Sequence, residues 1–167
     1  IEGNFSRKEQ SQIIKTYKRI LNQNHHQERI NNLLWDGKYR TAARLLKYVD
    51  KDYQKLYEAR IGLISFAGGV DNLIKQVPSY LKNDPGLIYD RINWRIKKRK
   101  YDSALSLLLE TNKINANELI RPEKFWSKKN FLIRRLIDKH EYDTAYLLAI
   151  NHGLNENKDI AEAEWLA

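Results

Sequence analysis

The side chains that could carry out acid–base or metal chemistry are few, and their spacing matches no common arrangement for such chemistry. The four histidines are His25, His26, His140 and His152. The adjacent pair faces apart on a helix, whereas a zinc-binding pair prefers a spacing of i and i+4 with carboxylates nearby. The chain has no cysteine, which excludes disulfides, thiol catalysis and cysteine–zinc sites. We therefore predict neither a metal site nor a cofactor.

Candidate catalytic groups are equally sparse. A glycosidase-type reaction needs a carboxylic acid whose pKa is raised inside a cleft. Glu162 and Glu164 are two positions apart, so they point to different faces of a helix. Gly68 and Gly69 lack the Lys-Ser/Thr pair that completes a phosphate-binding loop, and no serine lies in a strand-to-helix elbow. The sequence therefore predicts no catalytic residue.

Clustered cations form a more suggestive pattern. The chain has 30 Lys and Arg against 21 Asp and Glu, a net charge of +9, which favours acidic partners. "RIKKRK" covers residues 95–100, and "RPEKFWSKKN" mixes cations with aromatic rings over residues 121–130. Such a mixture can bind nucleic acid through phosphate contacts and stacking. It suits equally a carboxylate-bearing glycan whose sugar rings lie on the aromatic faces.

Eight residues of these clusters are the predicted glycan-binding residues: Arg95, Lys97, Lys98, Arg99, Lys124, Trp126, Arg134 and Arg135. A plainer interpretation is also open. The cations would then form solvated helix faces, and the tryptophans would pack between helices.

The apolar residues that must position these groups recur with the period of an α-helix. In residues 6–24 the apolar stripe includes Tyr17 and Ile20, and Ser6 followed by Glu9 forms a capping box. Proline and glycine mark the helix boundaries. Asp84 is the expected N-cap before Pro85, and Pro122 opens a longer helix. No segment alternates with a period of two, so the sequence predicts an all-α fold.

One phrase recurs along the chain, a Tyr followed by two residues, an Ala and a leucine run. It occurs as "GKYRTAARLL" (37–46), "RKYDSALSLL" (99–108) and "HEYDTAYLLA" (140–149). Tyr39 and Tyr101 are 62 positions apart, with Val70 midway, and Tyr101 and Tyr142 are 41 apart. Repeats of this length, each a helix pair, are typical of an α-solenoid.

The repeated residues are predicted to be structural. The Ala would let the second helix of each pair approach the first closely, and Leu46, Leu108 and Leu148 or Ala149 would fill the space between hairpins. The structural set is Tyr39, Ala42, Tyr101, Ala104, Tyr142 and Ala145.

The expected architecture is a superhelix of stacked antiparallel helical hairpins. An N-terminal helix lies within residues 1–24, and the helical-repeat domain covers residues 25–167. Its expected units span residues 25–50, 51–80, 84–112 and 122–154, with a last, truncated helix at 158–167.

Longer phrases resemble one known family. They are, in order, "HHQERINNLLWDGKYRTAARLL", "YEARIGLISFAGGVDNLIKQVP", "DPGLIYDRINWRIKKRKYDSALSLLLE", "RPEKFW", and "AYLLAINHGL" followed by "AEAEWLA". From about residue 25 to the end, the chain resembles the superhelical, non-catalytic domain of soluble lytic murein transglycosylases, especially of their alphaproteobacterial branch.

The resemblance implies a periplasmic protein that acts on peptidoglycan. Family members cleave the β-1,4 bond between MurNAc and GlcNAc without water and leave a 1,6-anhydro end. Their helical domain holds the glycan strand beside a lysozyme-like domain, whose catalytic Glu lies in a Glu-Ser motif. No Glu of this chain is followed by Ser, so no catalytic residue is carried over.

The resemblance therefore leads us to expect a scaffold that is inactive by itself. Its expected partners are peptidoglycan glycan strands and the catalytic domain of the same parent protein. We expect no nucleic-acid partner, no transmembrane segment, and a signal peptide outside this chain.

Two other functions stay open at this point. The repeat could be a protein–protein adaptor, because tetratricopeptide units are close to it in length, although their residue pattern is not met. The net charge and "RIKKRK" also permit a nucleic-acid-binding repeat.

Overall fold

A computed structural model describes residues 5–111, 121–154 and 160–166, and every regular element in these ranges is helical. The all-α prediction is thus confirmed, while the stacking of hairpins into a superhelix stays a prediction.

The chain divides into two compact units, Ile1–Leu87 and Ile88–Ala167. The division falls inside the expected unit 84–112, and residues 112, 158, 159 and 167 of the expected units lie outside the described ranges. No helix in the described ranges combines the length and the apolar character needed to cross a bilayer.

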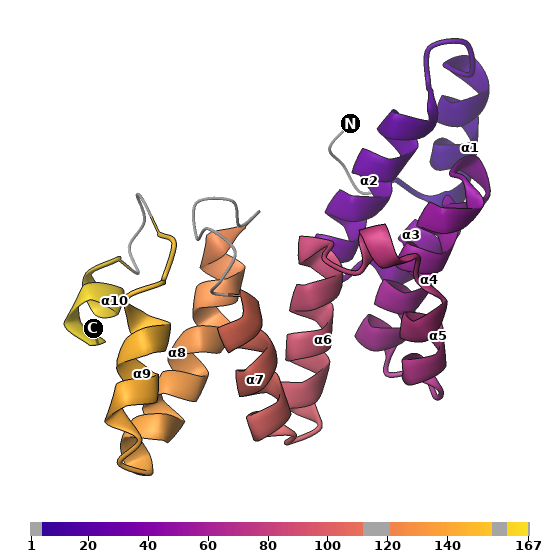
Figure 1. Cartoon of the computed structure of the whole chain (residues 1–167). Helices are drawn as coiled ribbons and strands as arrows, with labels where there is room; N and C mark the ends of the chain where they lie inside the picture. The colour runs from indigo at the N-terminus through magenta and orange to yellow at the C-terminus, as the bar shows by residue number, and fades with distance from the viewer. Residues whose placement is uncertain (1–4, 112–120, 155–159, 167) are drawn as a thin grey trace. The chain divides into compact units, whose positions relative to one another are not determined.

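The first unit is built from consecutive helices around a leucine-rich core (Figure 1). They are α1 (Arg7–Thr16), α2 (Gln23–Trp35), α3 (Tyr39–Ala43), the 3₁₀ turn η1 (Leu46–Tyr48), α4 (Lys51–Ser65), α5 (Val70–Gln76) and the 3₁₀ turn η2 (Ser79–Leu81). α2 packs against α3 and α4, and α4 packs against α5. Ile30, Leu34 and Leu56 are almost completely buried between them.

Helix α1 begins as predicted but ends early. The hydroxyl of Ser6 accepts the N–H of Glu9 at 3.2 Å, and the N–H of Ser6 donates to Oε2 of Glu9 at 2.7 Å. The expected helix continues past Tyr17, but the N–H groups of Ile20 and Leu21 both donate to the carbonyl of Tyr17 and turn the chain away. The prediction of one long stripe is therefore wrong at Tyr17 and Ile20, which are 50% and 70% exposed.

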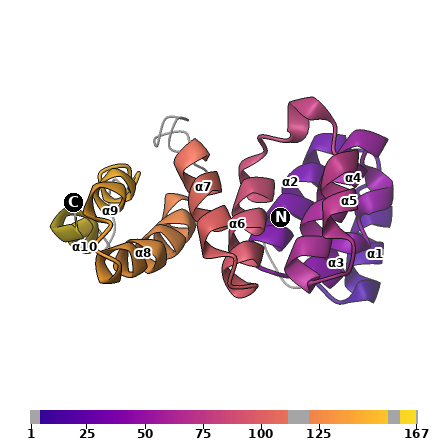
Figure 2. The ribbon, with the colours of Figure 1, turned by 60° about the horizontal axis from the view of Figure 1, so that its bottom comes forward.

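The second unit continues from α6 (Pro85–Lys97), the helix in which the division falls. The remaining helices are α7 (Tyr101–Thr111), α8 (Pro122–Asp138), α9 (Tyr142–Ala149) and α10 (Ile160–Leu166). α8 and α9 form a hairpin with α10 beside α9 (Figure 2). The proline predictions are confirmed: Oδ1 of Asp84 accepts the N–H of Leu87 at 2.8 Å, and Pro85 and Pro122 are first helical residues.

The repeated phrase is a repeated corner between helices. Tyr39, Tyr101 and Tyr142 are each the first residue of a helix. Two positions before each tyrosine lies a left-handed residue: Gly37, Arg99 and His140, with φ of 73°, 59° and 62°. The next N–H closes the preceding helix by donating to a carbonyl five residues back: Lys38 to Leu33, Lys100 to Arg95 and Glu141 to Leu136, at 2.8–2.9 Å. This is the Schellman arrangement of a helix C-terminus.

The alanines of the phrase are buried as predicted, since Ala42, Ala104 and Ala145 are at most 3% exposed. Leu108, Leu148 and Ala149 are buried as well. The prediction for Leu46 is wrong, because α3 ends at Ala43 and the chain passes into η1. Leu45 is buried there instead, and Leu46 is half-buried.

Val70, which lies midway between Tyr39 and Tyr101 in the sequence, is also the first residue of a helix. Val70 begins α5, as its alignment with the tyrosines predicts. The corner before it is longer, because the left-handed residue is Phe66, with φ 58°, and Gly69 adds a second positive φ of 73°.

We expect Gly37→Ala to lower the free energy of unfolding by about 1 kcal/mol, because alanine pays a steric cost at positive φ. A Cβ there meets nothing within 4 Å, so the whole effect is conformational. Urea unfolding followed by circular dichroism measures it. Gly37→Asn is the matched control, since Asn tolerates this conformation and should lose less. Equal losses in the two variants would contradict a conformational cause.

Candidate functional site

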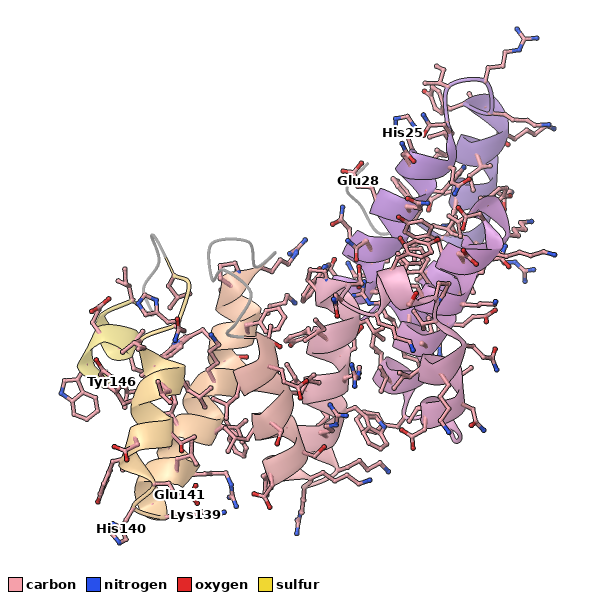
Figure 3. The ribbon with its side chains drawn as sticks, in the orientation of Figure 1. His25, Glu28, Lys139, His140, Glu141 and Tyr146 are labelled. Carbon is pink, nitrogen blue, oxygen red and sulfur yellow. The ribbon has the colours of Figure 1, made fainter. Side chains whose placement is uncertain are left out.

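The histidines of the described ranges make local structural contacts, and Figure 3 places His25 on α2 and His140 just before α9. Nδ1 of His25 accepts the N–H of Asn22 at 3.2 Å, and His140 lies 2.7 Å from the hydroxyl of Tyr142 at the α8–α9 corner. Nε2 of His152 lies 3.1 Å from Oε1 of Glu164. Among the described residues, no three potential ligands gather as a metal site would need.

Helix α8 distributes its cations over two faces. Lys124 and Lys128 are one turn apart, and Lys128 lies toward the ring of Tyr89 on α6. Arg134 points toward α10, where its Nη2 lies 2.5 Å from Oε1 of Glu162, and Nε of Arg134 donates to Asn130 at 2.9 Å. The helix thus directs Lys128 toward α6 and Arg134 toward α10.

Lys97 and Lys124 of the second unit both act electrostatically on Lys128, and we name these three residues the lysine cluster. Burial lowers the pKa of Lys128, and the charges of Lys97 and Lys124 lower it further. The three come from α6 and α8, so the fold brings like charges together from residues far apart in sequence. Lys97 is exposed, and the other two are half-buried. A bound anion would relieve the repulsion between them.

The aromatic ring of Tyr89 lies beneath the Lys128 amine of the lysine cluster. Nζ of Lys128 lies 5.9 Å from the ring centre of Tyr89, which meets Phe125 edge-on at 5.5 Å. Burial raises the pKa of the Tyr89 hydroxyl, and the nearby Asp90 raises it further, so this phenol stays neutral at physiological pH. The cluster therefore combines cationic groups with a neutral hydroxyl and an apolar ring, a set that suits the carboxylates and hydroxyls of an acidic saccharide.

The other predicted cations of α6 lie at its C-terminal end. Lys98 and Arg99 are exposed at the corner, where Arg99 takes the left-handed conformation that ends the helix. Arg95 is half-buried one turn earlier. Lys100 lies over the ring of Trp94 at 5.3 Å. Lys98, Arg99 and Lys100 are all exposed and directly follow Lys97 along the chain.

Three predicted residues have structural contacts instead. The indole of Trp126 is 2% exposed and meets His152 edge-on at 6.3 Å, so its ring is not available to a sugar in this structure. The guanidinium of Arg135 stacks 3.9 Å from the centre of the Tyr101 ring and holds α8 to α7. Arg134 holds α8 to α10 through Glu162. Because Trp126, Arg134 and Arg135 are engaged in these contacts, we do not include them in the candidate site.

Tyr89 and Lys128 are the two residues of the candidate site that sequence reasoning missed. The one available signal was the i, i+4 spacing of Lys124 and Lys128. Nothing in the local pattern indicates that Tyr89 and Lys97 lie opposite them, because that proximity comes from tertiary packing.

Comparison with known proteins gave no further guide. No protein-family model matches the chain, and neither a curated protein nor a solved structure matches it.

Proposed function

We propose that this chain is the non-catalytic helical scaffold of a periplasmic lytic murein transglycosylase and that it binds peptidoglycan. The lysine cluster carries the proposal, because it gathers three ammonium groups on two helices beside a tyrosine. Peptidoglycan offers the matching partner, a hydroxyl-rich glycan whose peptide stems carry carboxylates. The resemblance of the ordered sequence phrases supports the same assignment.

The proposal places the bond-cleaving chemistry outside this chain. Glu162 accepts hydrogen bonds from Asn130 at 2.6 Å and Arg134 at 2.5 Å, so both of its oxygens are engaged in holding α10 to α8. Glu164 lies beside His152 and is exposed. Neither carboxyl group lies in an apolar cleft that would make it a general acid. The scaffold would position the strand for a separate catalytic domain.

The geometry favours a glycan over single-stranded nucleic acid. Proteins that bind single strands stack successive bases on exposed aromatic rings along a cationic groove. Near the lysine cluster, Phe125 and Trp126 are buried, and Tyr89 is half-buried beneath Lys128. The described surface here thus offers charge without a row of stacking platforms.

Co-sedimentation with purified peptidoglycan sacculi tests the proposal. We expect saturable binding that weakens between about 50 and 200 mM salt, because charge contacts are screened. The turbidity of the sacculi should stay constant, since the chain cleaves nothing by itself. Clearing of the suspension would contradict the scaffold role. Absence of sacculus binding, together with tight binding of a single-stranded oligonucleotide at the same salt, would replace the proposal by nucleic-acid binding.

A further inference from the structure

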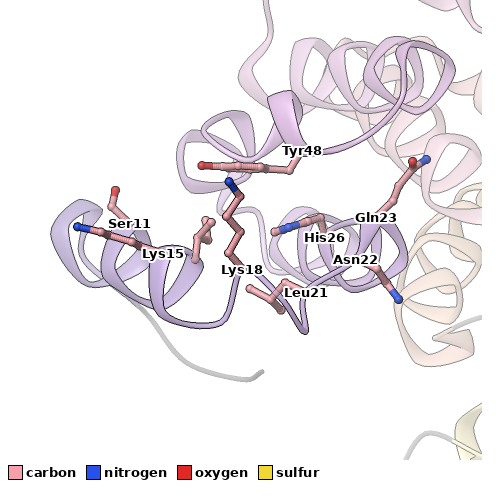
Figure 4. A pocket seen from close by; sticks show the side chains of 9 residues that line it. Ser11, Lys15, Lys18, Leu21, Asn22, Gln23, His26 and Tyr48 are labelled. Atoms are coloured by element: carbon pink, nitrogen blue, oxygen red, sulfur yellow. The ribbon is translucent and has the colours of Figure 1, made fainter.

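A second site of different construction lies in the first unit, between α1 and the segment from α2 to η1 (Figure 4). We name this cavity of about 540 Å³ the Tyr48 cleft. Ligand-binding pockets commonly have volumes of about 300–1,000 Å³, so a mono- or disaccharide fits this one. Its polar and aromatic lining includes Lys15, Lys18, Asn22, Gln23, His26 and Tyr48.

The cleft has an aromatic wall. The rings of His26 and Tyr48 stack at 4.8 Å with an angle of 20° between their planes. Burial lowers the pKa of His26, and the neighbouring His25 lowers it further, so the stacked imidazole is neutral at physiological pH. η1 fixes the backbone of Tyr48, and Figure 4 shows its ring across the opening above His26 and Lys18. The stacked rings form a flat surface of the kind that packs against one face of a ring-shaped ligand, and Nζ of Lys47 lies 5.0 Å from the centre of the Tyr48 ring.

Positive charge surrounds this wall. Lys15 and Lys18 line the cleft, and a neighbouring cavity of about 240 Å³, which shares Tyr48, is lined by Arg7, Arg44 and Lys47. Among the described residues that line these two cavities there is no Asp or Glu. Nε of Arg44 is buried and has no hydrogen-bond partner within the described part of the chain. An anion entering here would meet cations on both sides of Tyr48.

Amide groups complete the lining. The side-chain amide of Gln23 donates to Oδ2 of Asp50, which leaves its oxygen as an acceptor. Oδ1 of Asn22 caps α2 by accepting the N–H of His25 at 3.2 Å, which leaves its NH₂ group as a donor. These groups present donors and acceptors to hydroxyls, the commonest polar groups of a sugar.

We propose that the Tyr48 cleft binds an acidic sugar, with the ring against Tyr48 and the carboxylate or phosphate at the amine of Lys18, which points toward Tyr48 in Figure 4, while Lys15 adds positive charge to the same cleft. This site stands on the first unit alone and does not depend on the function proposed above. Titration of the ¹⁵N-labelled full chain with glucuronate, glucose 6-phosphate and glucose, followed by ¹H–¹⁵N spectra, tests it. We expect the amides of residues 15–26 and 48 to shift with the two acidic sugars, and glucose to bind at least about tenfold more weakly.

Substitutions in the Tyr48 cleft test which side chains contact the bound sugar. Lys15→Ala/Lys18→Ala should weaken binding of the preferred acidic sugar about tenfold or more, and Tyr48→Leu should weaken it while preserving apolar bulk. Lys8→Ala is the matched control, because Lys8 is exposed on the same helix and lines neither cavity. Preference for glucuronate identifies a carboxylate as the bound group, and preference for glucose 6-phosphate identifies a phosphate.

Three results would overturn the proposal. The first is glucose binding as tightly as both acidic sugars. The second is unchanged affinity in the double lysine variant. The third is tighter binding of AMP than of either acidic sugar, which would assign the cleft to nucleotides.

Discussion

Replacing Gly86 by alanine should lower the free energy of unfolding of the first unit by about 3 kcal/mol, the upper range for overpacking of a core. A Cβ at this position would lie 2.2 Å from Cζ of Arg60. A flexible side chain could normally move away, but the Arg60 side chain is fully buried. Nη1 of Arg60 donates to Asn31 at 2.5 Å and lies 3.8 Å from Oδ1 of Asp84. Its guanidinium also lies over the ring of Trp35 at 5.5 Å.

The cost of the substitution therefore comes from displacing a buried charge. Arg60 cannot leave Gly86 without lengthening its contacts with Asn31 and Asp84, and a buried cation that loses its partners is expensive. Asp84 is also the N-cap of α6, so the disturbance would reach the start of that helix. Urea unfolding monitored by tryptophan fluorescence is a suitable measurement, because Trp35 reports directly on this contact.

Gly68→Ala is the matched control. A Cβ there meets nothing within 4 Å, and Gly68 is not among the described glycines with positive φ. We expect its stability to remain within about 0.5 kcal/mol of the original chain or to rise slightly, because alanine restricts the unfolded state. A loss in Gly86→Ala no greater than that in Gly68→Ala would contradict the proposed clash.

The second large effect concerns pH and a buried lysine in the second unit. Lys129 is 1% exposed, and its amine donates to the backbone carbonyl of Asn151. Burial lowers the pKa of Lys129 from 10.5 to about 8. Between these pH values the unfolded chain binds the proton and the folded unit does not, so stability rises with pH. We expect a rise of about 2 kcal/mol between pH 7.5 and 9.5 from this group.

Lys129→Met tests the assignment. Methionine fills a similar volume without a charge, so this variant should lack the rise, and at pH 7.5 it should be at least as stable as the original chain. Urea unfolding at several pH values measures both quantities. The window should stop below pH 10, because burial also raises the pKa of Tyr57 in the first unit, which lowers stability at higher pH.

A surface lysine provides the comparison for this experiment. Lys139 is exposed at the α8–α9 corner, and Lys139→Met should retain the rise. If Lys129→Met showed the same rise as the original chain, the buried amine would not be its source.

The local features of the fold could be predicted from the sequence because they depend on neighbouring residues. The capping box of Ser6, the proline-marked helix starts and the alanine at each corner follow from patterns a few residues long. The contact between Arg60 and Gly86 could not be predicted, because it joins residues 26 positions apart and buries a side chain that usually faces solvent.

The candidate site likewise has a part that could be predicted from the sequence and a part that depends on tertiary packing. The cations of α6 and α8 are visible in the sequence, but only the packing selects Lys97, Lys124 and Lys128 and engages Arg134 and Arg135 elsewhere. Trp126 lies on the buried face of α8 together with Phe125, Lys129 and Ile133. The sequence left both the glycan-binding and the packing interpretation of Trp126 open, and in the structure its ring is buried.

The most direct test of the central claim is the affinity of a lysine-cluster variant for purified peptidoglycan. Lys97→Gln/Lys124→Gln/Lys128→Gln removes three of the charges that give the chain its net +9. Lys51→Gln/Lys55→Gln/Lys75→Gln removes the same charge from exposed positions of the first unit and is the matched control. We expect the cluster variant to lose about tenfold or more in affinity and the control to stay within about twofold. Equal losses in both variants, or no loss in the cluster variant, would contradict the claim.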